Sequence, residues 1–344
     1  MTEESKTTDA PVPGSPDYPL HSELTIGAYL KQQVAIDPDH EFVVYPDRDL
    51  RWTYKDFDER TDALAKGLLA IGMKPGDHLG VWARNIPDWL TFMYASAKIG
   101  VVMVTVNPVY KSHELDYVLK QSDMKALCVI DAYRDVDYLQ IIRDLVPESL
   151  NVQRGFLHSE AYPFLENLIY MGPEKHRGFY SVPELLLLGQ HKPDSSLEWA
   201  QGQFDNNDVV MMQYTSGTTG LPRGVLLSHG ALLRRTAIDI EGMRFSHDDI
   251  LLCELPLFHV TFVSTLATLA LGARLVIADS HKPADIAADI VRTGATRTAL
   301  VPCLMRGLAD YVAREGIELD TLELVIYGGE PVEPELLEHC RRLL

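Results

Sequence analysis

The sequence predicts an α/β protein built on two doubly wound, largely parallel sheets with flanking helices. Two observations carry this prediction. Short runs of β-branched and other apolar residues alternate with amphipathic segments from Thr53 to Ile130, and the alternation returns after Asp208. Strands that are apolar on both faces and separated by helices are typical of parallel sheets covered on both sides. The 344 residues, 46% of them hydrophobic, are enough for two lobes.

The first lobe opens with a helix signal. Thr53 and Asp56 have the spacing of a capping box, and apolar residues at helical spacing follow until Pro75-Gly76 stops the pattern. The elements expected next are a strand at His78–Ala83, a helix at Pro87–Ile99, a strand at Val101–Val106, a helix at Ser112–Gln121 and a strand at Ala126–Ile130.

The stretch from residue 150 to 203 interrupts this rhythm with prolines, histidines and scattered charge. Only Val182–Leu188 has a helical pattern there, so we interpret the stretch as a surface connector. Beyond it, strands are expected at Val209–Gln213, Gly224–Leu227, Ile250–Leu255, Arg274–Ala278, Thr298–Val301 and Leu324–Tyr327. Helices are expected at Gly230–Ile240, Phe262–Leu271, Pro283–Thr293 and Leu304–Glu315. The predicted domains are a flexible tail (1–23), a first α/β lobe with its connector (24–203) and a second α/β lobe (204–344).

Composition excludes several classes of function. Lys and Arg number 31 against 49 Asp and Glu, and the resulting net charge of −18 argues against nucleic-acid binding. The four cysteines are far apart and lack metal-ligand spacing, which favours reduced thiols in a cytoplasmic protein and no metal site. No apolar run is long enough to span a membrane. The acidic, Pro/Ser/Thr-rich N-terminus lacks the features of a signal peptide.

One stretch carries chemistry, and its sequence is MMQYTSGTTGLPRGVLLSH, residues 211–229. Its glycines let successive backbone N–H groups turn towards one point, and its hydroxyls add uncharged donors. Such a ring of donors suits a polyphosphate, and a guanidinium adds a fixed positive charge. The candidate phosphate-binding residues are Thr215, Ser216, Gly217, Thr218, Thr219, Gly220 and Arg223.

The loop differs from a Walker P-loop, which requires G-x-x-x-x-G-K-[ST] leading into a helix. Here Pro222 follows the glycines and the next residues, Val225–Leu227, have a strand pattern, so the loop is expected to join two strands. Composition alone leaves another interpretation open, which is a hairpin turn rich in small polar residues, with Arg223 as a surface side chain.

The wording YTSGTTGLPRGVLLSH closely resembles the signature loop of the adenylate-forming superfamily, and the chain resembles its acyl-CoA synthetase branch from about Leu24 to the end. In that superfamily the loop wraps the β- and γ-phosphates of ATP. The resemblance therefore implies the large N-terminal domain of such an enzyme, incomplete at its C-terminus, with ATP, Mg²⁺ and CoA as substrates and cofactor.

Two further stretches resemble the family. The first is LPLFHVTF, residues 255–262, in which the resemblance places His259 beside the acyl pocket. On its own, a histidine at the end of an apolar strand is more often a core histidine than a ligand contact. The second is LVIYGGEPVEPEL, residues 324–336, where Gly328, Gly329 and Glu330 are expected beside the adenine and the acyl chain. Without the resemblance these three residues describe a tight turn before a helix, although the carboxyl edge of a parallel sheet is where ligands collect.

Two residues depart from the family pattern. The family usually has lysine where this chain has Arg223, and a planar guanidinium binds phosphate differently from a point charge. Glu330 occupies a position where a small residue is commoner, which puts the class of acid in doubt.

The resemblance implies parts that this sequence does not contain. These are an aromatic-Gly-x-Thr-Glu stretch, an aspartate for the ribose and a mobile C-terminal lid domain with a catalytic lysine. The catalytic residues are therefore expected downstream of Leu344, and the chain is expected to be inactive alone. The expected partners of the whole protein are a carboxylic acid, ATP and CoA, with no nucleic acid and no integral membrane segment.

Two other functions remain open at this stage. The acceptor could be a carrier-protein thiol instead of CoA. Alternatively, the protein could bind nucleotide or acyl groups without catalysis, in which case Arg223 would mark lost activity.

Overall fold

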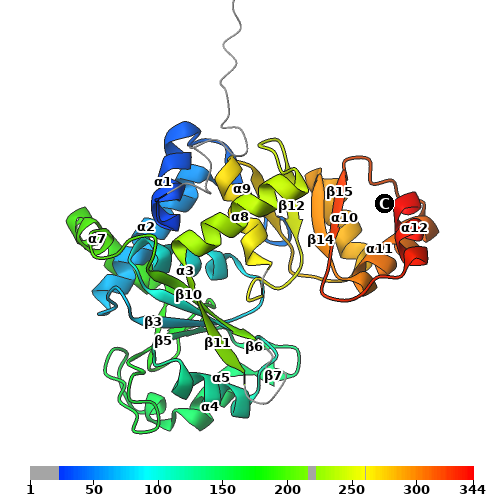
Figure 1. Ribbon diagram of the computed structural model, residues 1–344. Helices are drawn as coiled ribbons and strands as arrows, with labels where there is room; N and C mark the ends of the chain where they lie inside the picture. The colour runs from blue at the N-terminus through cyan, green and yellow to red at the C-terminus, as the bar shows by residue number, and fades with distance from the viewer. Residues whose placement is uncertain (1–22, 216–221, 260) are drawn as a thin grey trace, which may run out of the picture.

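The computed structural model describes residues 23–215, 222–259 and 261–344 (Figure 1). Two sheets of mostly parallel strands lie with helices between and around them, as the sequence predicts. All of the expected N-terminal tail except Glu23 lies outside the described residues.

The larger sheet has seven strands in the order β11-β10-β4-β3-β5-β8-β9, and only the outermost pair, β10 and β11, is antiparallel. Its strands are β3 (His78–Trp82), β4 (Val102–Val106), β5 (Met124–Val129), β8 (Asn167–Tyr170), β9 (Phe179–Ser181), β10 (Val209–Thr215) and β11 (Arg223–Ser228). Helices α4 (Ser112–Gln121) and α5 (Tyr138–Leu145) lie on one face, whereas α2 (Tyr54–Ala70), α3 (Pro87–Lys98) and α8 (His229–Met243) lie on the other (Figure 1).

The smaller sheet has six strands in the order β15-β14-β12-β13-β1-β2, again with one antiparallel pair at an edge, β1 and β2. Its strands are β1 (Glu41–Tyr45), β2 (Leu50–Thr53), β12 (Ile250–Cys253), β13 (Arg274–Ile277), β14 (Arg297–Leu300) and β15 (Leu324–Tyr327). Alternate residues of β12 and β13 face two different cores: Leu251 and Leu275 join the main core, and Leu252 and Val276 join a smaller one.

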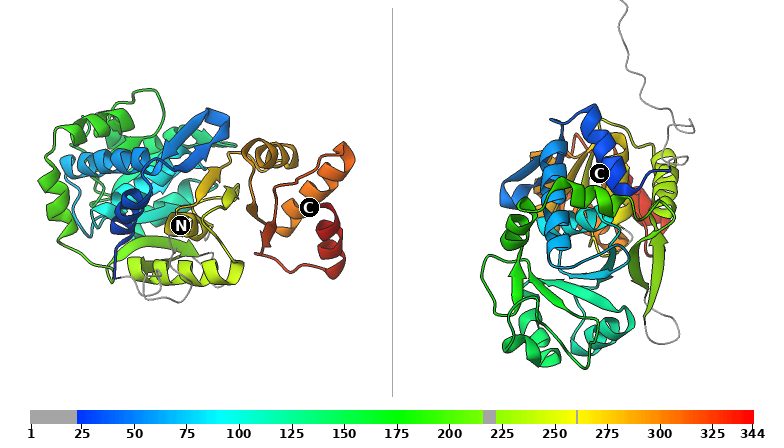
Figure 2. Two further views of the ribbon diagram at one scale, coloured as in Figure 1. Left: turned by 90° about the horizontal axis from the view of Figure 1, so that it is seen from above. Right: turned by 90° about the vertical axis from the view of Figure 1, so that its left-hand side faces the viewer.

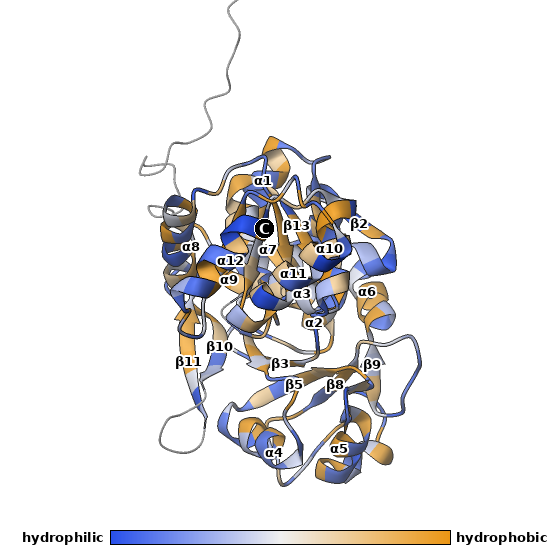
Figure 3. Cartoon of the chain, turned by 90° about the vertical axis from the view of Figure 1, so that its right-hand side faces the viewer, coloured by the Kyte–Doolittle hydropathy of each residue, from blue (hydrophilic) through white to orange (hydrophobic). Residues whose placement is uncertain are grey.

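Helix α9 (Phe262–Leu271) packs on the main-core side of this sheet, and α10 (Pro283–Thr293) and α11 (Pro302–Glu315) pack on the other side. With α12 (Pro334–Leu343) these last helices form the end of the molecule farthest from α1 (Ile26–Ile36) (Figure 2). Hydrophobic residues follow the strands, and hydrophilic residues colour much of α10 and α12 (Figure 3).

The strands are not divided between the two sheets at the domain boundary that the sequence predicts between residues 203 and 204. Strands β10 and β11, expected in the second lobe, extend the larger sheet, where Met211 of β10 pairs with Met103 of β4. Conversely, β1 and β2 precede the first predicted helix but belong to the smaller sheet, where Val43 pairs with Leu275. Hydrophobic patterning identifies a buried strand but carries no information about which of two apolar sheets it joins.

The stretch interpreted as a surface connector is more regular than expected. It contributes β8 and β9 to the larger sheet, and it contains α6 (Val182–Gln190) and α7 (Asp194–Gln201). The remaining short elements are β6 (Ala132–Tyr133), β7 (Val136–Asp137) and the 3-10 turns η2 (Pro46–Arg48) and η3 (Pro147–Leu150).

Helix α2 begins as predicted. The Thr53 hydroxyl accepts a hydrogen bond from the Asp56 backbone N–H, and the Asp56 carboxylate accepts one from the Thr53 N–H, so the capping box is confirmed. Farther along, α2 lies against α6 at two glycines. A Cβ on Gly67 would be 2.2 Å from the Leu185 carbonyl oxygen, and one on Gly189 would be 1.9 Å from the Ala63 carbonyl oxygen.

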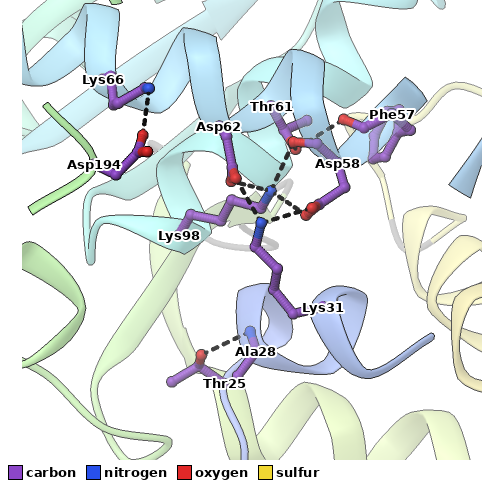
Figure 4. Close-up of polar contacts among 10 residues, drawn as sticks. All are labelled: Thr25, Ala28, Lys31, Phe57, Asp58, Thr61, Asp62, Lys66, Lys98 and Asp194. Atoms are coloured by element: carbon purple, nitrogen blue, oxygen red, sulfur yellow. Dashed lines mark hydrogen bonds and ion pairs between the residues drawn. The ribbon is translucent and has the colours of Figure 1, made fainter. Parts of the chain in front are cut away.

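A buried ion network joins α1, α2 and α3 (Figure 4). The fully buried Lys98 ammonium donates to the carboxylates of Asp58 (2.6 Å) and Asp62 (2.5 Å) and to the Asp58 backbone carbonyl (3.0 Å). Lys31 binds the second oxygen of each carboxylate. The helices approach closely here, since a Cβ on Gly27 would be 2.8 Å from the Lys98 side chain.

In the described residues we find no helix that combines the length and the apolar character needed to cross a membrane.

Candidate functional site

The hydroxyl-rich loop begins at the end of β10 and ends at the start of β11. Thr215 and Arg223 are cross-strand neighbours in this antiparallel pair, so the prediction that the loop joins two strands is confirmed. Both side chains are exposed. The predicted phosphate-binding residues between them, Ser216, Gly217, Thr218, Thr219 and Gly220, lie outside the described residues.

Helix α4 supports the base of this hairpin. The Tyr117 hydroxyl donates to the Pro222 carbonyl (3.1 Å), and the Tyr214 hydroxyl donates to the side-chain carbonyl of Gln121. Burial raises the pKa of Tyr214, so its hydroxyl remains a donor across the physiological range. The two ends of the loop are therefore fixed at a defined separation and orientation.

His259 lies in the connection between β12 and α9. We call residues 255–259 the His259 segment. The imidazole is exposed, with its ring 5.9 Å from that of Phe258. This position rules out the interpretation of His259 as a core histidine.

Two amide side chains from the larger sheet hold the His259 segment. Asn85, just beyond β3, accepts a hydrogen bond from the Leu257 N–H (2.9 Å) and donates to the Leu255 carbonyl (3.0 Å). Gln213 of β10 donates to the Phe258 carbonyl (3.1 Å). Because Gln213 lies two residues before Thr215, this bond links the loop hairpin directly to the segment that carries His259.

A buried carboxyl group lies immediately before the segment. Glu254 follows β12, is 0% exposed, and its Oε2 lies 2.8 Å from the Thr298 hydroxyl of β14. Burial raises the pKa of Glu254 to about 8, against smaller opposing effects of the Thr298 and backbone hydrogen bonds. His281 lies beyond β13, and burial lowers the pKa of its imidazole.

Arginines join the carboxyl ends of the two sheets beside this position. Arg84, beyond β3, and Arg48, in η2, bind the same oxygen of Asp279 beyond β13, at 2.5 and 2.9 Å. The carboxyl ends of β3, β12 and β13 therefore meet at one place, where ligands of open α/β sheets bind.

Gly328, Gly329 and Glu330 follow the edge strand β15, and all three are exposed. Gly329 has a φ of +86°, a conformation that favours glycine. Since β15, β14 and β12 are adjacent and parallel, this turn lies at the same sheet edge as Glu254, about 10 Å away across two strand spacings.

Sequence reasoning missed three residues that shape this site, Asn85, Gln213 and Glu254. A signal existed for each. Glu254 is a lone carboxylate in the apolar run LLCELPLF, Asn85 lies just beyond a buried strand, and Gln213 is a polar residue inside one. Among the described residues, no group of three or more His, Cys, Asp or Glu could hold a metal ion, so we assign no magnesium ligands within them.

The family of AMP-binding enzymes matches residues 30–344, and the chain belongs to that family. It is 38% identical over 321 residues to the candidate acyl-CoA synthetase YngI of Bacillus subtilis (strain 168), covering 93% of this chain and 58% of YngI. It is 29% identical over 322 residues to the mitochondrial medium-chain acyl-CoA ligase ACSF2 of Homo sapiens, covering 91% of this chain and 52% of ACSF2. The chain thus spans between half and three-fifths of these curated relatives.

Solved structures share the fold. The long-chain-fatty-acid-CoA ligase FadD1 of Archaeoglobus fulgidus superposes with a TM-score of 0.79 at 21% identity, covering 94% of this chain and 61% of FadD1. A candidate long-chain-fatty-acid CoA ligase of Rhodopseudomonas palustris CGA009 superposes with a TM-score of 0.76 at 24% identity, covering 93% of this chain and 73% of the ligase. The predicted fold class, two largely parallel sheets with flanking helices, is therefore confirmed.

Proposed function

We propose that the chain is the ATP-binding part of an AMP-forming acid–thiol ligase that makes acyl-CoA from a carboxylic acid. The observation that carries the proposal is the hydrogen bond from Gln213 to the Phe258 carbonyl. It joins the hairpin that presents the hydroxyl-rich loop to the segment that presents His259. A phosphate site on the hairpin and an acyl site on the His259 segment would then be held at a fixed distance and orientation. A reaction between the ligands of the two sites requires this.

The reaction has two half-steps. A carboxylate oxygen of the acid bonds to the α-phosphorus of ATP. The phosphoanhydride bond between the α- and β-phosphates breaks, and pyrophosphate leaves. The CoA sulfur, having lost its proton, then bonds to the acyl carbon, and AMP leaves. In the proposal Thr215, Arg223 and the loop between them hold the departing phosphates by charge-assisted hydrogen bonds.

The acyl group and adenine would occupy the carboxyl edge of the smaller sheet. His259 would border the carboxylate end of the acid, and the turn of Gly328, Gly329 and Glu330 would line the adenine and acyl chain. Exposure of all four residues at one sheet edge supports this placement. Mg²⁺, when bound with ATP, would neutralise phosphate charge.

We place the protein in the cytoplasm. All four cysteines are free thiols, and Cys128, Cys253 and Cys340 are buried, which fits a reducing compartment. The proposed partners are small molecules, namely an acid, ATP and CoA.

Acid-dependent exchange of labelled pyrophosphate into ATP by the full-length protein tests the first half-step. A panel of short-, medium- and long-chain acids should include at least one that supports exchange. If ATP binds but no acid supports exchange, the protein is a binding protein without catalysis, and the ligase proposal is wrong. If exchange occurs but CoA releases no AMP while a carrier-protein thiol does, the acceptor is the carrier.

We also propose that residues 1–344 alone complete neither half-step. The chain covers 58% of YngI and 52% of ACSF2, which supports assigning further catalytic groups to the rest of the protein. Purified residues 1–344 should bind ATP weakly and give no exchange. Exchange at a rate similar to that of the full-length protein would contradict this.

A further inference from the structure

Glu254 is a buried acid whose surroundings match its neutral form. The Thr298 hydroxyl lies within hydrogen-bonding distance of two acceptors, the Leu252 carbonyl at 3.2 Å and Glu254 Oε2 at 2.8 Å. A hydroxyl carries one proton and can donate only once. Both contacts are satisfied together when Glu254 is protonated, because its O–H then donates to Thr298 and Thr298 donates to Leu252.

The charged form can accept a hydrogen bond from Thr298, but it has no cation partner among the described residues. Within the described part of the chain, no Lys or Arg forms an ion pair with Glu254, and Oε1 of Glu254 has no well-formed hydrogen bond. A carboxylate buried without a cation partner is disfavoured relative to the acid.

The titratable groups packed around Glu254 do not change this conclusion. Asp289 of α10 adds negative charge, and its own cation partner Arg292 is shared with Asp47. Burial raises the pKa of the adjacent Cys253 thiol, which is therefore neutral.

His281, which lies beyond β13, is also uncharged at neutral pH. Burial and then the charge of Arg134 lower the pKa of His281, while the backbone of Glu254 and the nearby Asp279 act in the opposite direction. At and above pH 7, Glu254 is thus the group in this cluster that changes charge.

Glu254 immediately precedes the His259 segment, and its contacts fix the position at which the segment begins. Its side chain contacts β14, and three of the next four residues are held by side chains: Leu255 and Leu257 by Asn85, and Phe258 by Gln213. A displacement of Glu254 would be transmitted along the chain to Leu255 and to the bonds with Asn85.

We propose that Glu254 is a positioning residue that fixes the His259 segment as the neutral acid, and that its ionisation releases the segment. On ionisation the Thr298 proton turns to the carboxylate and away from the Leu252 carbonyl, and the charge draws water or moves outward. The proposal deepens the proposed function, since it makes the geometry of the acyl site depend on pH.

Amide NMR of residues 1–344 between pH 7 and 9.5 tests this without any ligand. The amide signals of Leu255, Leu257 and His259 should shift together in one transition, with a midpoint near the pKa of about 8. In Glu254→Gln the transition should be lost, because the carboxamide donates to Thr298 at every pH. The exposed Glu318→Gln is the matched control and should keep the wild-type transition.

A second variant examines the hydroxyl itself. Thr298→Val keeps the branched shape but removes a hydroxyl that accepts from the neutral acid and donates to the carboxylate. The charge-assisted bond to the carboxylate is the stronger of the two. Its loss therefore costs the charged form more, and the midpoint should move to higher pH. An unchanged midpoint, a transition that survives in Glu254→Gln, or no transition in the wild type would each overturn the proposal. These outcomes are independent of the pyrophosphate-exchange assay, so they leave the ligase proposal to be judged separately.

Discussion

At position 98 a lysine ammonium is buried among three helices, and it is accommodated because every proton finds an acceptor. Asp58 and Asp62 supply carboxylates, and each carboxylate also binds Lys31 from the far side (Figure 4). Such a network stabilises little by itself relative to apolar packing, but removing one member leaves uncompensated buried charge.

Lys98→Met should therefore lower the free energy of unfolding by about 3–5 kcal/mol, because Asp58 is left buried with one cation instead of two. Urea unfolding followed by tryptophan fluorescence measures the change. The matched control is Lys66→Met, because Lys66 pairs with the exposed Asp194. It should leave the unfolding midpoint almost unchanged. Equal effects in the two variants would contradict a special role for the network.

Arg223 provides a second prediction at this scale. Its guanidinium is exposed at the end of the loop, so its removal should not affect folding. If it binds a phosphate, Arg223→Gln in the full-length protein should weaken ATP binding by about 10- to 100-fold, the equivalent of one charge-assisted hydrogen bond of about 1.5–3 kcal/mol.

Isothermal titration calorimetry with ATP measures the affinity. Arg223→Lys should retain most of it, and Arg314→Gln, an exposed change on α11, should have no effect. If Arg223→Gln binds ATP as tightly as the wild type, Arg223 is a surface residue.

At the scale of elements, the pair α2 and α6 shows packing that depends on the absence of a side chain. Gly189→Ala would place a methyl group 1.9 Å from the Ala63 carbonyl oxygen, and backbone must move to admit it. We expect a loss of about 1–3 kcal/mol in the free energy of unfolding, the usual cost of overpacking.

Gly242→Ala is the control for that prediction. Gly242 lies in α8, is exposed, and has nothing within 4 Å of the added Cβ. Alanine should stabilise the helix there by about 0.5–1 kcal/mol. Thermal unfolding should thus move in opposite directions for the two variants, and a shift in the same direction would count against the packing argument.

Elements with strong local signals were predictable. The alternation of apolar strands and capped helices gave β3, α3, β4, α4 and β5 within a residue or two. Strands β8 and β9 were missed because each is short and lies among prolines, glycines and histidines. Only the pairing of β8 with β5, and of β9 with β8, defines them. The positions of β10 and β1 in the two sheets are likewise determined by pairing with strands that are distant in the sequence. No local sequence pattern indicates that pairing.

Some residues of the candidate site could likewise be predicted from the sequence, and others could not. The sequence motifs were enough to single out His259, Gly329 and the loop ends as candidates. Asn85 and Gln213 were not, because their role is to hold backbone groups 45 or more residues away in the sequence. Tertiary contacts of this kind leave no periodicity.

For the whole molecule, two buried groups shape the dependence of stability on pH in opposite ways. His229 accepts a hydrogen bond from the Ile26 N–H, and burial lowers its pKa from 6.5 to about 4. The folded state therefore binds fewer protons than the unfolded state between these values, so stability is lost as pH falls below about 6.5.

Glu254 acts in the other direction. Because its folded pKa is raised from 4.5 to about 8, the folded state binds more protons in that range, and stability falls as pH rises. From pH 6.5 to 8 the expected loss is about 2 kcal/mol. The difference between wild type and Glu254→Gln, from urea unfolding at several pH values, isolates this contribution. A difference that does not vary with pH would contradict the assignment.

Interleaving of the two sheets has a consequence for synthesis of the chain. Val43 of β1 pairs with Leu275 of β13, so the partner emerges from the ribosome 232 residues later. At about 5–20 residues per second this delay is roughly 10–50 s, during which β1 has no parallel neighbour. We therefore expect the nascent N-terminal portion to depend on chaperones that shield its apolar strand until β13 is made.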